Sequence, residues 1–324
     1  MMNMGIILTI VVPVYKVEAY INKCLDSLLV SPELMKKLEV LIINDGTPDH
    51  SAEMSREYVK RYPETFRQID TENGGHGSAW NMGLKEATGK YLRFLDSDDW
   101  FSNLDRLLVD LQKSDADIVF NPFNKYLAYE NRNVIIDTPI PAGETRLPDY
   151  WGGNDVNFWG ATYKTSILRP LLPLFAEGVM YDDFILTWVP LVYGRTCIAL
   201  DFVVYNYLIG RPGQTMDVTK QRKGALSYVK CFEQYEKVRA RVASLEVPAT
   251  NLSRIDFAIA GYASYIFAYM LYLPYWEAKS RMKYLWGNYV AGYEYKSKLE
   301  NRYERMPFLL FTVVEFIRRK MLNR

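Results

Sequence analysis

The sequence has little of what zinc sites and disulfide frameworks need. Its three cysteines, Cys24, Cys197 and Cys231, lie far apart with no C-x-x-C pair, and its only histidines are His50 and His76. This excludes a zinc cluster and favours a reducing compartment. The net charge of +1 lacks the basic footprint of a nucleic-acid-binding protein, so no nucleic-acid partner is expected.

Membrane-directing segments are equally scarce. The first 15 residues are apolar but carry no basic leader and no small-residue cleavage site, so we expect a strand there and not a signal peptide. The stretch 257–276 has no charged residue. Its tyrosines at 262, 265, 269 and 272 recur at helical spacing, which favours a packed helix over a membrane span. We therefore expect a cytoplasmic protein.

What the sequence does contain is an alternation of strands and helices. With 324 residues, 49% of them hydrophobic, the chain can bury a sizeable core. Apolar runs at 6–14, 38–43 and 91–95 and a short strand at 67–70 are separated by helical patterns at 18–29, 51–61 and 78–87. This predicts an α/β fold with a mostly parallel sheet, whose ligands bind at the carboxyl ends of the strands. Further along we expect a helix at 103–113, a strand at 118–123, a hairpin at 126–136, an irregular loop at 139–153 and short strands at 197–201 and 203–209.

From residue 220 onward helical periodicity dominates. We expect helices at 221–245, 253–273, 276–289 and 307–323, and hence a domain at 1–215 followed by a helical region at 216–324. The tail 307–324 begins with apolar residues, and its second half contains four basic residues, Arg318, Arg319, Lys320 and Arg324. It can lie on an anionic membrane surface, pack as a terminal helix or form a homodimer contact, and the sequence leaves all three open.

The most acidic stretch is GKYLRFLDSDDW, residues 89–100, in which a buried strand runs into Asp96, Asp98 and Asp99. Clustered carboxylates repel one another unless a cation lies between them, and Mg²⁺ or Mn²⁺ takes such oxygens. In extended backbone, residues two apart point to the same side, so Asp96 and Asp98 would face one ion. Asp99 would lie opposite or cap a helix. The alternative is a solvated turn or helix cap.

A glycine-rich loop, NGGHGSAWNMG at residues 73–83, precedes a predicted helix. Free N–H groups and the helix dipole suit a phosphate there, although any tight turn has the same composition. It is not a P-loop, and it does not follow the first strand, where a dinucleotide fingerprint belongs. Both readings stay open.

Three stretches together carry a resemblance. PVYKVEAYINKCLDSLL, VLIINDGTPDHS and NGGHGSAWNMGLKEATGKYLRFLDSDDW resemble the nucleotide-sugar domain of the family 2 glycosyltransferases. The resemblance implies the Rossmann-like GT-A fold, a nucleotide-sugar donor and Mn²⁺ or Mg²⁺. The chain departs from the family at Lys16, where Asn is usual, and at Asn44 and Thr47, where Asp and Ser are usual. It also has Trp80 where many members have Arg, and His76 is expected to take part of that role.

The same resemblance implies the donor contacts. Asp45 would contact the base, and Asp96 and Asp98 would hold the metal and the ribose, with Asp98 the more direct ligand of the cation. The other donor-binding residues implied are Pro13, Val14, Tyr15 and Glu18 around the nucleoside, and Gly75, His76, Asn81, Ser97 and Arg211.

A second acidic pair, Asp182-Asp183, completes the expected site. An inverting transfer needs a carboxylate that accepts the proton of the acceptor hydroxyl, and Asp183 matches the catalytic base of the family. The alternative is that both residues cap a helix at 184–193. The predicted function is inverting sugar transfer, from a UDP-sugar to a cell-surface glycan or its lipid-linked precursor. The competing class is a non-catalytic nucleotide-sugar-binding scaffold subunit.

Overall fold

The computed structural model describes residues 5–138, 143–145, 157–180, 182–187, 196–211, 224–245, 249–267, 269–273 and 275–285, together with 247, 287, 288, 313 and 317. The chain divides into two compact units, Met1–Gln214 and Thr215–Arg324. Most of the expected loop at 139–153, and the tail 307–324 except for Val313 and Ile317, lie outside the described residues. The expected domain boundary at 215 also falls there.

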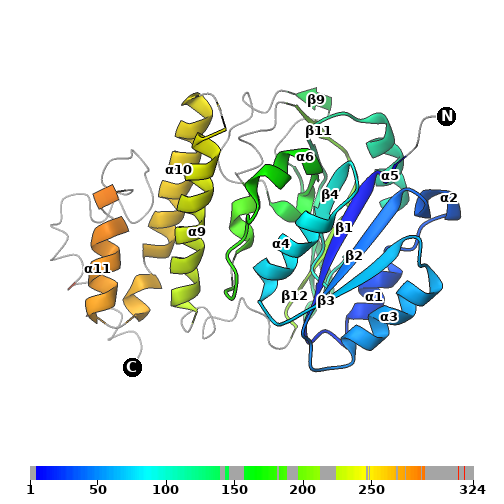
Figure 1. Cartoon of the computed structure of the whole chain (residues 1–324), viewed down its shortest axis with the longest axis horizontal. Coiled ribbons are helices and arrows are strands. Elements are labelled where there is room, and N and C mark those ends of the chain that lie inside the picture. Colours follow the sequence, from blue (N-terminus) through cyan, green and yellow to red (C-terminus); the bar gives the residue numbers. More distant parts are fainter. Residues whose placement is uncertain are drawn as a thin grey trace. The chain divides into compact units, whose positions relative to one another are not determined.

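The first unit is built on an eight-stranded sheet with the order β3-β2-β1-β4-β10-β6-β11-β9 (Figure 1). Strands β3, β2, β1 and β4 are mutually parallel, as are β6 and β11, whereas β10 and β9 run antiparallel to their neighbours. The α/β fold with a mostly parallel sheet is therefore confirmed. The strands are β1 (Leu8–Val14), β2 (Leu38–Asp45), β3 (Phe66–Thr71), β4 (Tyr91–Phe94), β6 (Ile118–Phe120), β9 (Gly143–Thr145), β10 (Ala161–Lys164) and β11 (Cys197–Ala199).

The strand order indicates where on the sheet a ligand binds. Starting from β1, the chain adds β2 and β3 on one side and then crosses to add β4 on the other, so the order reverses between β1 and β4. In open α/β sheets ligands bind at such a switch point, beside the carboxyl ends of the strands. Helix α4 makes this crossing and lies along β1 and β2. The helices of this unit are α1 (Ile21–Asp26), α2 (Pro32–Met35), α3 (Ser51–Arg61), α4 (His76–Glu86), α5 (Leu104–Lys113) and α6 (Thr165–Leu168).

The predicted strand at 118–123 is broken in the structure. β6 ends at Phe120, and Phe123 begins a strand of a second sheet. Between them Asn121 donates its backbone N–H to the Gly160 carbonyl at 2.8 Å, and Pro122 has no N–H to give to a ladder. The chain can therefore leave the first sheet at this point.

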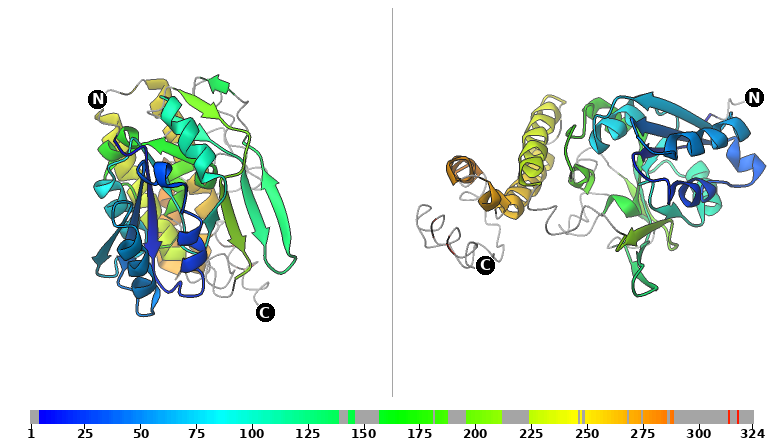
Figure 2. Two further views of the ribbon diagram at one scale, coloured as in Figure 1. Left: turned by 90° about the vertical axis from the view of Figure 1, so that its right-hand side faces the viewer. Right: turned by 90° about the horizontal axis from the view of Figure 1, so that it is seen from below.

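The second sheet has four strands in the order β5-β12-β7-β8. The hairpin predicted at 126–136 is present as β7 and β8, and Figure 2 shows it projecting from the rest of this unit. Strand β12 pairs with β5, which directly follows the acidic turn. The bounds are β5 (Trp100–Phe101), β7 (Phe123–Leu127), β8 (Arg132–Ile136) and β12 (Tyr205–Ile209).

The second unit is helical, as predicted. It contains α9 (Ala225–Ala243), α10 (Ala249–Phe267), the short 3-10 helix η5 (Tyr269–Tyr272) and α11 (Tyr275–Leu285). Tyr262 on α10 is 2% exposed and its ring lies 4.7 Å from that of Tyr235 on α9, which agrees with a packed helix. Among the described helices, none combines the length and apolarity needed to cross a membrane.

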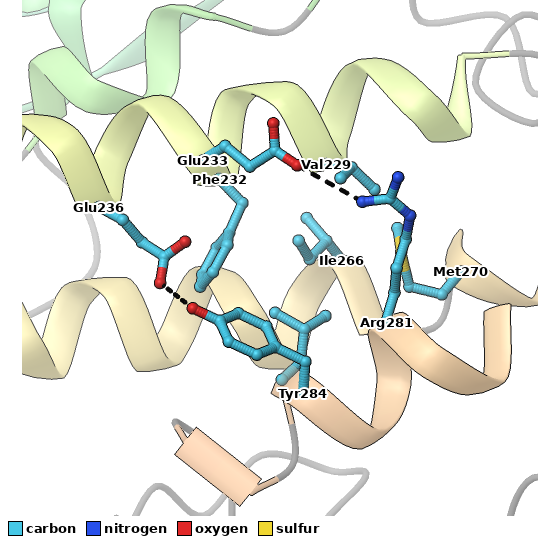
Figure 3. Close-up of a pocket in the computed structure, with 9 residues that line it drawn as sticks. Val229, Phe232, Glu233, Glu236, Ile266, Met270, Arg281 and Tyr284 are labelled. Atoms are coloured by element: carbon cyan, nitrogen blue, oxygen red, sulfur yellow. Dashed lines mark hydrogen bonds and ion pairs between the residues drawn. The ribbon is translucent and has the colours of Figure 1, made fainter. Parts of the chain in front are cut away.

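A hollow opens between the helices of this second unit (Figure 3). Two polar contacts cross it: Tyr284 donates its hydroxyl to Glu236, and Arg281 approaches Glu233 at 3.5 Å. The apolar lining residues are Val229, Phe232, Ile266, Met270 and Leu285.

Candidate active site

The glycine-rich loop is shaped by Asp45, the last residue of β2. One carboxylate oxygen of Asp45 accepts the N–H of Gly74 at 2.7 Å and the other accepts the N–H of Gly75 at 3.0 Å. Asp45 is 3% exposed, so its carboxylate makes these hydrogen bonds in the protein interior. These two amides are therefore not free to cradle a phosphate. Asp45 thus holds the loop, and the base contact that the resemblance implied stays a prediction.

Glycine is required at two positions of this loop. Gly75 has φ +82°, and a Cβ there would lie 3.2 Å from the backbone of Gly178. At Gly77 a Cβ would lie 2.1 Å from the Ala176 carbonyl oxygen and 2.6 Å from Asp182 Oδ2. The loop thus packs directly against the segment that leads to Asp182.

His76, the first residue of α4, joins two carboxylates. Its Nδ1 lies 3.0 Å from Asp182 Oδ1 and its Nε2 lies 3.0 Å from Asp96 Oδ1. Both ring nitrogens can donate only in the imidazolium form. Burial disfavours that charge, but Asp182 and Asp96 outweigh burial and raise the pKa of His76 well above 6.5. A positive charge therefore links the acidic turn to the Asp182-Asp183 pair.

The acidic turn does not have the extended backbone that the spacing suggested. β4 ends at Phe94, and the chain turns through Ser97 and Asp98, with the N–H of Asp99 donated to the Asp96 carbonyl at 3.0 Å. Asp96 therefore contacts His76, whereas the Asp98 carboxylate accepts a hydrogen bond from Nε of Arg211. Burial and then the charge of Asp96 raise the pKa of Asp98, and Arg211 opposes that rise. Ser97 is 5% exposed within this turn.

Asp99 anchors β12. It is 1% exposed and accepts the hydroxyl of Tyr205 at 2.6 Å and the N–H of Leu208 at 2.7 Å. The same hydroxyl accepts the N–H of Asp96 at 3.2 Å. Burial, followed by the charges of Asp98 and Asp96, raises the pKa of Asp99 well above its ordinary value. The expectation that Asp99 caps a helix is wrong, because its carboxylate ties the turn to β12.

Asp182 and Asp183 differ in environment although they are adjacent. Asp182 is 2% exposed, and its Oδ2 has no hydrogen-bond partner among the described residues. Asp183 is partly exposed at the start of the 3-10 helix η4 (Asp183–Thr187). Burial and then Asp182 raise the pKa of Asp183 to about 6, with His76 opposing. A carboxylate with a pKa near neutrality is suited to general-base work. Of the helix predicted at 184–193, residues 188–193 lie outside the described part.

Asn81 holds the segment that precedes this pair. Its side-chain oxygen accepts the N–H groups of Leu174 at 2.9 Å and Phe175 at 3.0 Å. Its amide nitrogen donates to the Phe175 carbonyl at 3.0 Å and to Glu177 at 2.9 Å. Asn81 therefore positions this segment, and the donor contact that the resemblance implied stays a prediction.

The residues expected around the nucleoside lie at the carboxyl end of β1. Pro13 and Val14 are buried, and Tyr15 is 42% exposed. Glu18 accepts the N–H of His50 at 3.3 Å. The hydroxyl of Thr47 accepts the N–H of Lys16 at 2.8 Å.

A divalent ion fits the chemistry of the acidic turn. The described residues contain no group of three or more His, Cys, Asp or Glu side chains placed to hold a metal. Mg²⁺, however, commonly takes one or two protein carboxylates and completes its shell with phosphate oxygens and water. Asp96 and Asp98 offer such oxygens, and each is paired with a cationic side chain. Each carboxylate is thus already paired with a positively charged side chain. A bound metal ion with its diphosphate would take the place of those side chains.

Sequence reasoning missed two residues that hold the site together. Tyr205 of β12 bonds the acidic turn, which Arg211, implied by the resemblance, also reaches. Arg93 of β4 is fully buried and donates to the backbone of Trp159 at 2.6 Å. The alternation of Tyr205 with Tyr207 on a strand that ends near Arg211 was the available signal.

A mostly parallel sheet with carboxylates gathered at its switch point defines an α/β protein of the nucleotide-binding class. Over residues 9–170, half of its length, the chain matches the family described as Glycosyl transferase family 2. The chain therefore belongs to that family, which confirms the resemblance seen in its motifs.

Relatives of known name agree. The chain is 35% identical over 236 residues to the glycosyltransferase GlyA of Streptococcus pneumoniae, covering 68% of this chain and 32% of GlyA. It is 40% identical over 212 residues to the EpsH protein of Bacillus subtilis, covering 62% of this chain and 60% of EpsH. The chain thus spans between about a third and three fifths of the length of these relatives.

Solved structures share the fold. Residues 1–349 of S. aureus TarS, crystallised with UDP-GlcNAc, superpose with a TM-score of 0.57 at 19% identity, covering 90% of this chain and 93% of that one. The mannosyltransferase PcManGT from Pyrobaculum calidifontis, in complex with GDP-Man and Mn²⁺, gives a TM-score of 0.50 at 17% identity over 95% of this chain and 83% of that one. At these identities the likeness establishes the GT-A fold alone.

Proposed function

We propose that this chain transfers a sugar from a nucleotide-sugar donor to a hydroxyl group with inversion, and that Asp183 is the general base. The supporting observation is the environment of Asp183. Asp183 is partly exposed as a residue, burial raises the pKa of its carboxyl to about 6, and its neighbour Asp182 is joined through His76 to the acidic turn.

Each side chain has a definable task in this proposal. Asp183 accepts the proton of the attacking hydroxyl, an effect typically worth a factor of about 10² to 10⁴. His76 and Asp182 fix how far the base lies from the acidic turn, and such positioning is itself a large part of catalysis. Asn81 and Gly77 hold the segment that carries the base.

Asp98 and Asp96 would hold Mn²⁺ or Mg²⁺, which when bound neutralises charge on a departing diphosphate. When the diphosphate is bound, Arg211 would leave Asp98 and contact the phosphate oxygens, because a guanidinium matches phosphate geometry. Tyr205 and Asp99 keep the strand before Arg211 in place.

The donor that we propose is a UDP-sugar, because the motifs resemble the nucleotide-sugar domain of the family 2 glycosyltransferases and TarS was crystallised with UDP-GlcNAc. Its nucleoside would lie at the end of β1, beside Pro13, Val14, Tyr15 and Glu18. The proposed acceptor is a cell-surface glycan or its lipid-linked precursor, reached at the cytoplasmic face of the membrane. The supporting relatives include the minor teichoic acid biosynthesis protein GgaB of Bacillus subtilis, 34% identical over 118 residues, which are 35% of this chain and 13% of GgaB.

Nucleotide release tests the proposal. The full chain is incubated with a panel of nucleotide sugars and Mn²⁺ or Mg²⁺, with and without simple glycosides as acceptors. We expect release by the wild type, and a loss of transfer of about 100-fold or more in Asp183→Asn. Asp201→Asn is the matched control, because that side chain is 75% exposed and its ion pair with Arg106 lies on the surface. Nucleotide-sugar binding with no release under any condition would instead favour the scaffold subunit.

A further inference from the structure

Two aromatic side chains stack beside the site. The ring centroids of Trp159 and Tyr207 lie 4.4 Å apart with an interplanar angle of 17°. Trp159 belongs to the short 3-10 helix η2 (Phe158–Gly160) and Tyr207 to β12, so the pair joins segments far apart in the sequence. Both residues are partly exposed. Neither has a task in the chemistry described above.

Tyr207 faces the carboxylates. Residues two apart in a strand share a face, and the hydroxyl of Tyr205 on that face bonds Asp99. The N–H of Leu208, the next residue, bonds the same carboxylate at 2.7 Å. Burial, followed by the charges of the aspartates at 99, 96, 98 and 183, raises the pKa of Tyr207. Tyr207 therefore lies within electrostatic reach of both the acidic turn and Asp183.

Trp159 is held rigidly next to the proposed base. Its carbonyl accepts a hydrogen bond from the fully buried Arg93 at 2.6 Å, and Arg93 also donates to Thr162 at 2.8 Å. The ring of Phe123 packs 5.4 Å from that of Trp159. Helix η2 contacts η4, the helix that begins at Asp183. The stacked pair thus adjoins both the base and the acidic turn.

The indole N–H of Trp159 is a buried donor with no hydrogen-bond partner in the described part of the chain, and the same is true of Trp80 in the core. This N–H therefore does not by itself mark a ligand site. The ring of Trp159 is partly exposed and stacked beside the base, and such a ring offers an apolar surface to a partly apolar, hydroxyl-bearing ligand.

We propose that Trp159 and Tyr207 form the platform on which a sugar ring of the acceptor rests. A sugar presents an apolar C–H face to an aromatic ring and hydroxyls at its edge. The acceptor must lie next to the base that takes its proton, which is the position of this pair, whereas the nucleoside is proposed at the end of β1. The inference rests on the proposed function and adds where, and by which chemistry, the acceptor is recognised.

The indole signal of Trp159 tests this in the wild-type chain. Protein labelled with ¹⁵N-tryptophan is saturated with UDP and Mg²⁺, and Trp159→Phe identifies the signal by its loss. Methyl glycosides of glucose, galactose and N-acetylglucosamine are then titrated separately. We expect at least one to shift the Trp159 signal saturably. No shift with any of the three, or a shift caused by UDP with no further change on adding sugar, would overturn the platform.

Kinetics give an independent readout. In transfer to the glycoside that shifts the signal, Trp159→Leu is expected to raise the acceptor KM about tenfold, which corresponds to about 1.4 kcal/mol. Donor hydrolysis without acceptor should stay unchanged, and Trp159→Phe should retain most of the affinity. Trp276→Leu is the matched control, because Trp276 is 75% exposed in the helical unit. An equal fall in hydrolysis and transfer would assign the pair to the donor. Hydrolysis by the wild type supports the proposed function whichever way the Trp159 result falls.

Discussion

Replacing His76 with glutamine tests the charged link, by which we mean the ion pairs of His76 with Asp182 and Asp96. The variant keeps a polar side chain of similar reach but removes the positive charge between Asp182 and Asp96. Asp182 is 2% exposed and its other oxygen already lacks a partner, so it would be left as a buried, unpaired carboxylate. Removing one partner of a buried ion pair costs about 3–5 kcal/mol.

The exposure of His76 sets where in that range the loss should fall. Its side chain is 32% exposed, so water already screens part of the interaction, and we expect a loss of about 3 kcal/mol near pH 6.5. The pKa of His76 is raised in the folded state, so its contribution is fully present below 6.5 and is lost as pH rises through the raised value. The gap between wild type and variant should therefore narrow at alkaline pH.

Urea unfolding, followed by tryptophan fluorescence, measures this loss. A double-mutant cycle with Asp182→Asn isolates the pair, because in the double variant no unpaired carboxylate remains at position 182. We expect His76→Gln to be much less destabilising in the Asp182→Asn background than in the wild type. Additive losses, or a gap that widens as pH rises, would refute the charged link.

Three further outcomes follow from the site. Because the pKa of Asp183 is raised to about 6 and the base must be ionised, kcat/KM should fall about tenfold per pH unit below 6, and a flat profile down to pH 5 would contradict Asp183 as the base. Without nucleotide, Arg211→Gln should bind Mn²⁺ more tightly than the wild type, because the arginine no longer competes for Asp98, and it should bind UDP more weakly. Equilibrium titration with Mn²⁺ and with UDP measures both affinities. Chelation of the metal should abolish transfer by the wild type until Mn²⁺ or Mg²⁺ is restored. Gly77→Ala should lose about 1–3 kcal/mol in urea unfolding because its Cβ would meet the Ala176 carbonyl oxygen at 2.1 Å, whereas Gly5→Ala, with open space around it, should be neutral.

Local elements were predictable where one pattern dominated. α3 spans Ser51–Arg61 as expected, and the apolar runs predicted at 6–14 and 38–43 form the neighbouring parallel strands β1 and β2. The prediction of one strand at 118–123 was wrong, because Pro122 separates β6 from β7. Such choices depend on partners distant in sequence.

The sequence predicted members of the site but not the contacts that hold them in place. Asp45 and Asn81 were implied as donor contacts, and the structure shows that both accept backbone N–H groups of the protein. No local pattern gives these contacts, because the partner amides lie on segments distant in the sequence.

The sequence by itself determined that carboxylates follow the ends of buried strands, because apolar runs mark the strands and the alternation with helices makes the strands parallel, so that their carboxyl ends share one edge of the sheet. Only the tertiary structure decided which charged side chains form ion pairs with one another. His76 lies 106 positions from Asp182, and Arg211 lies 113 positions from Asp98. No local pattern connects residues so far apart, and their pairing arises because packing of the second sheet and of the segment at 174–183 brings them to the same place.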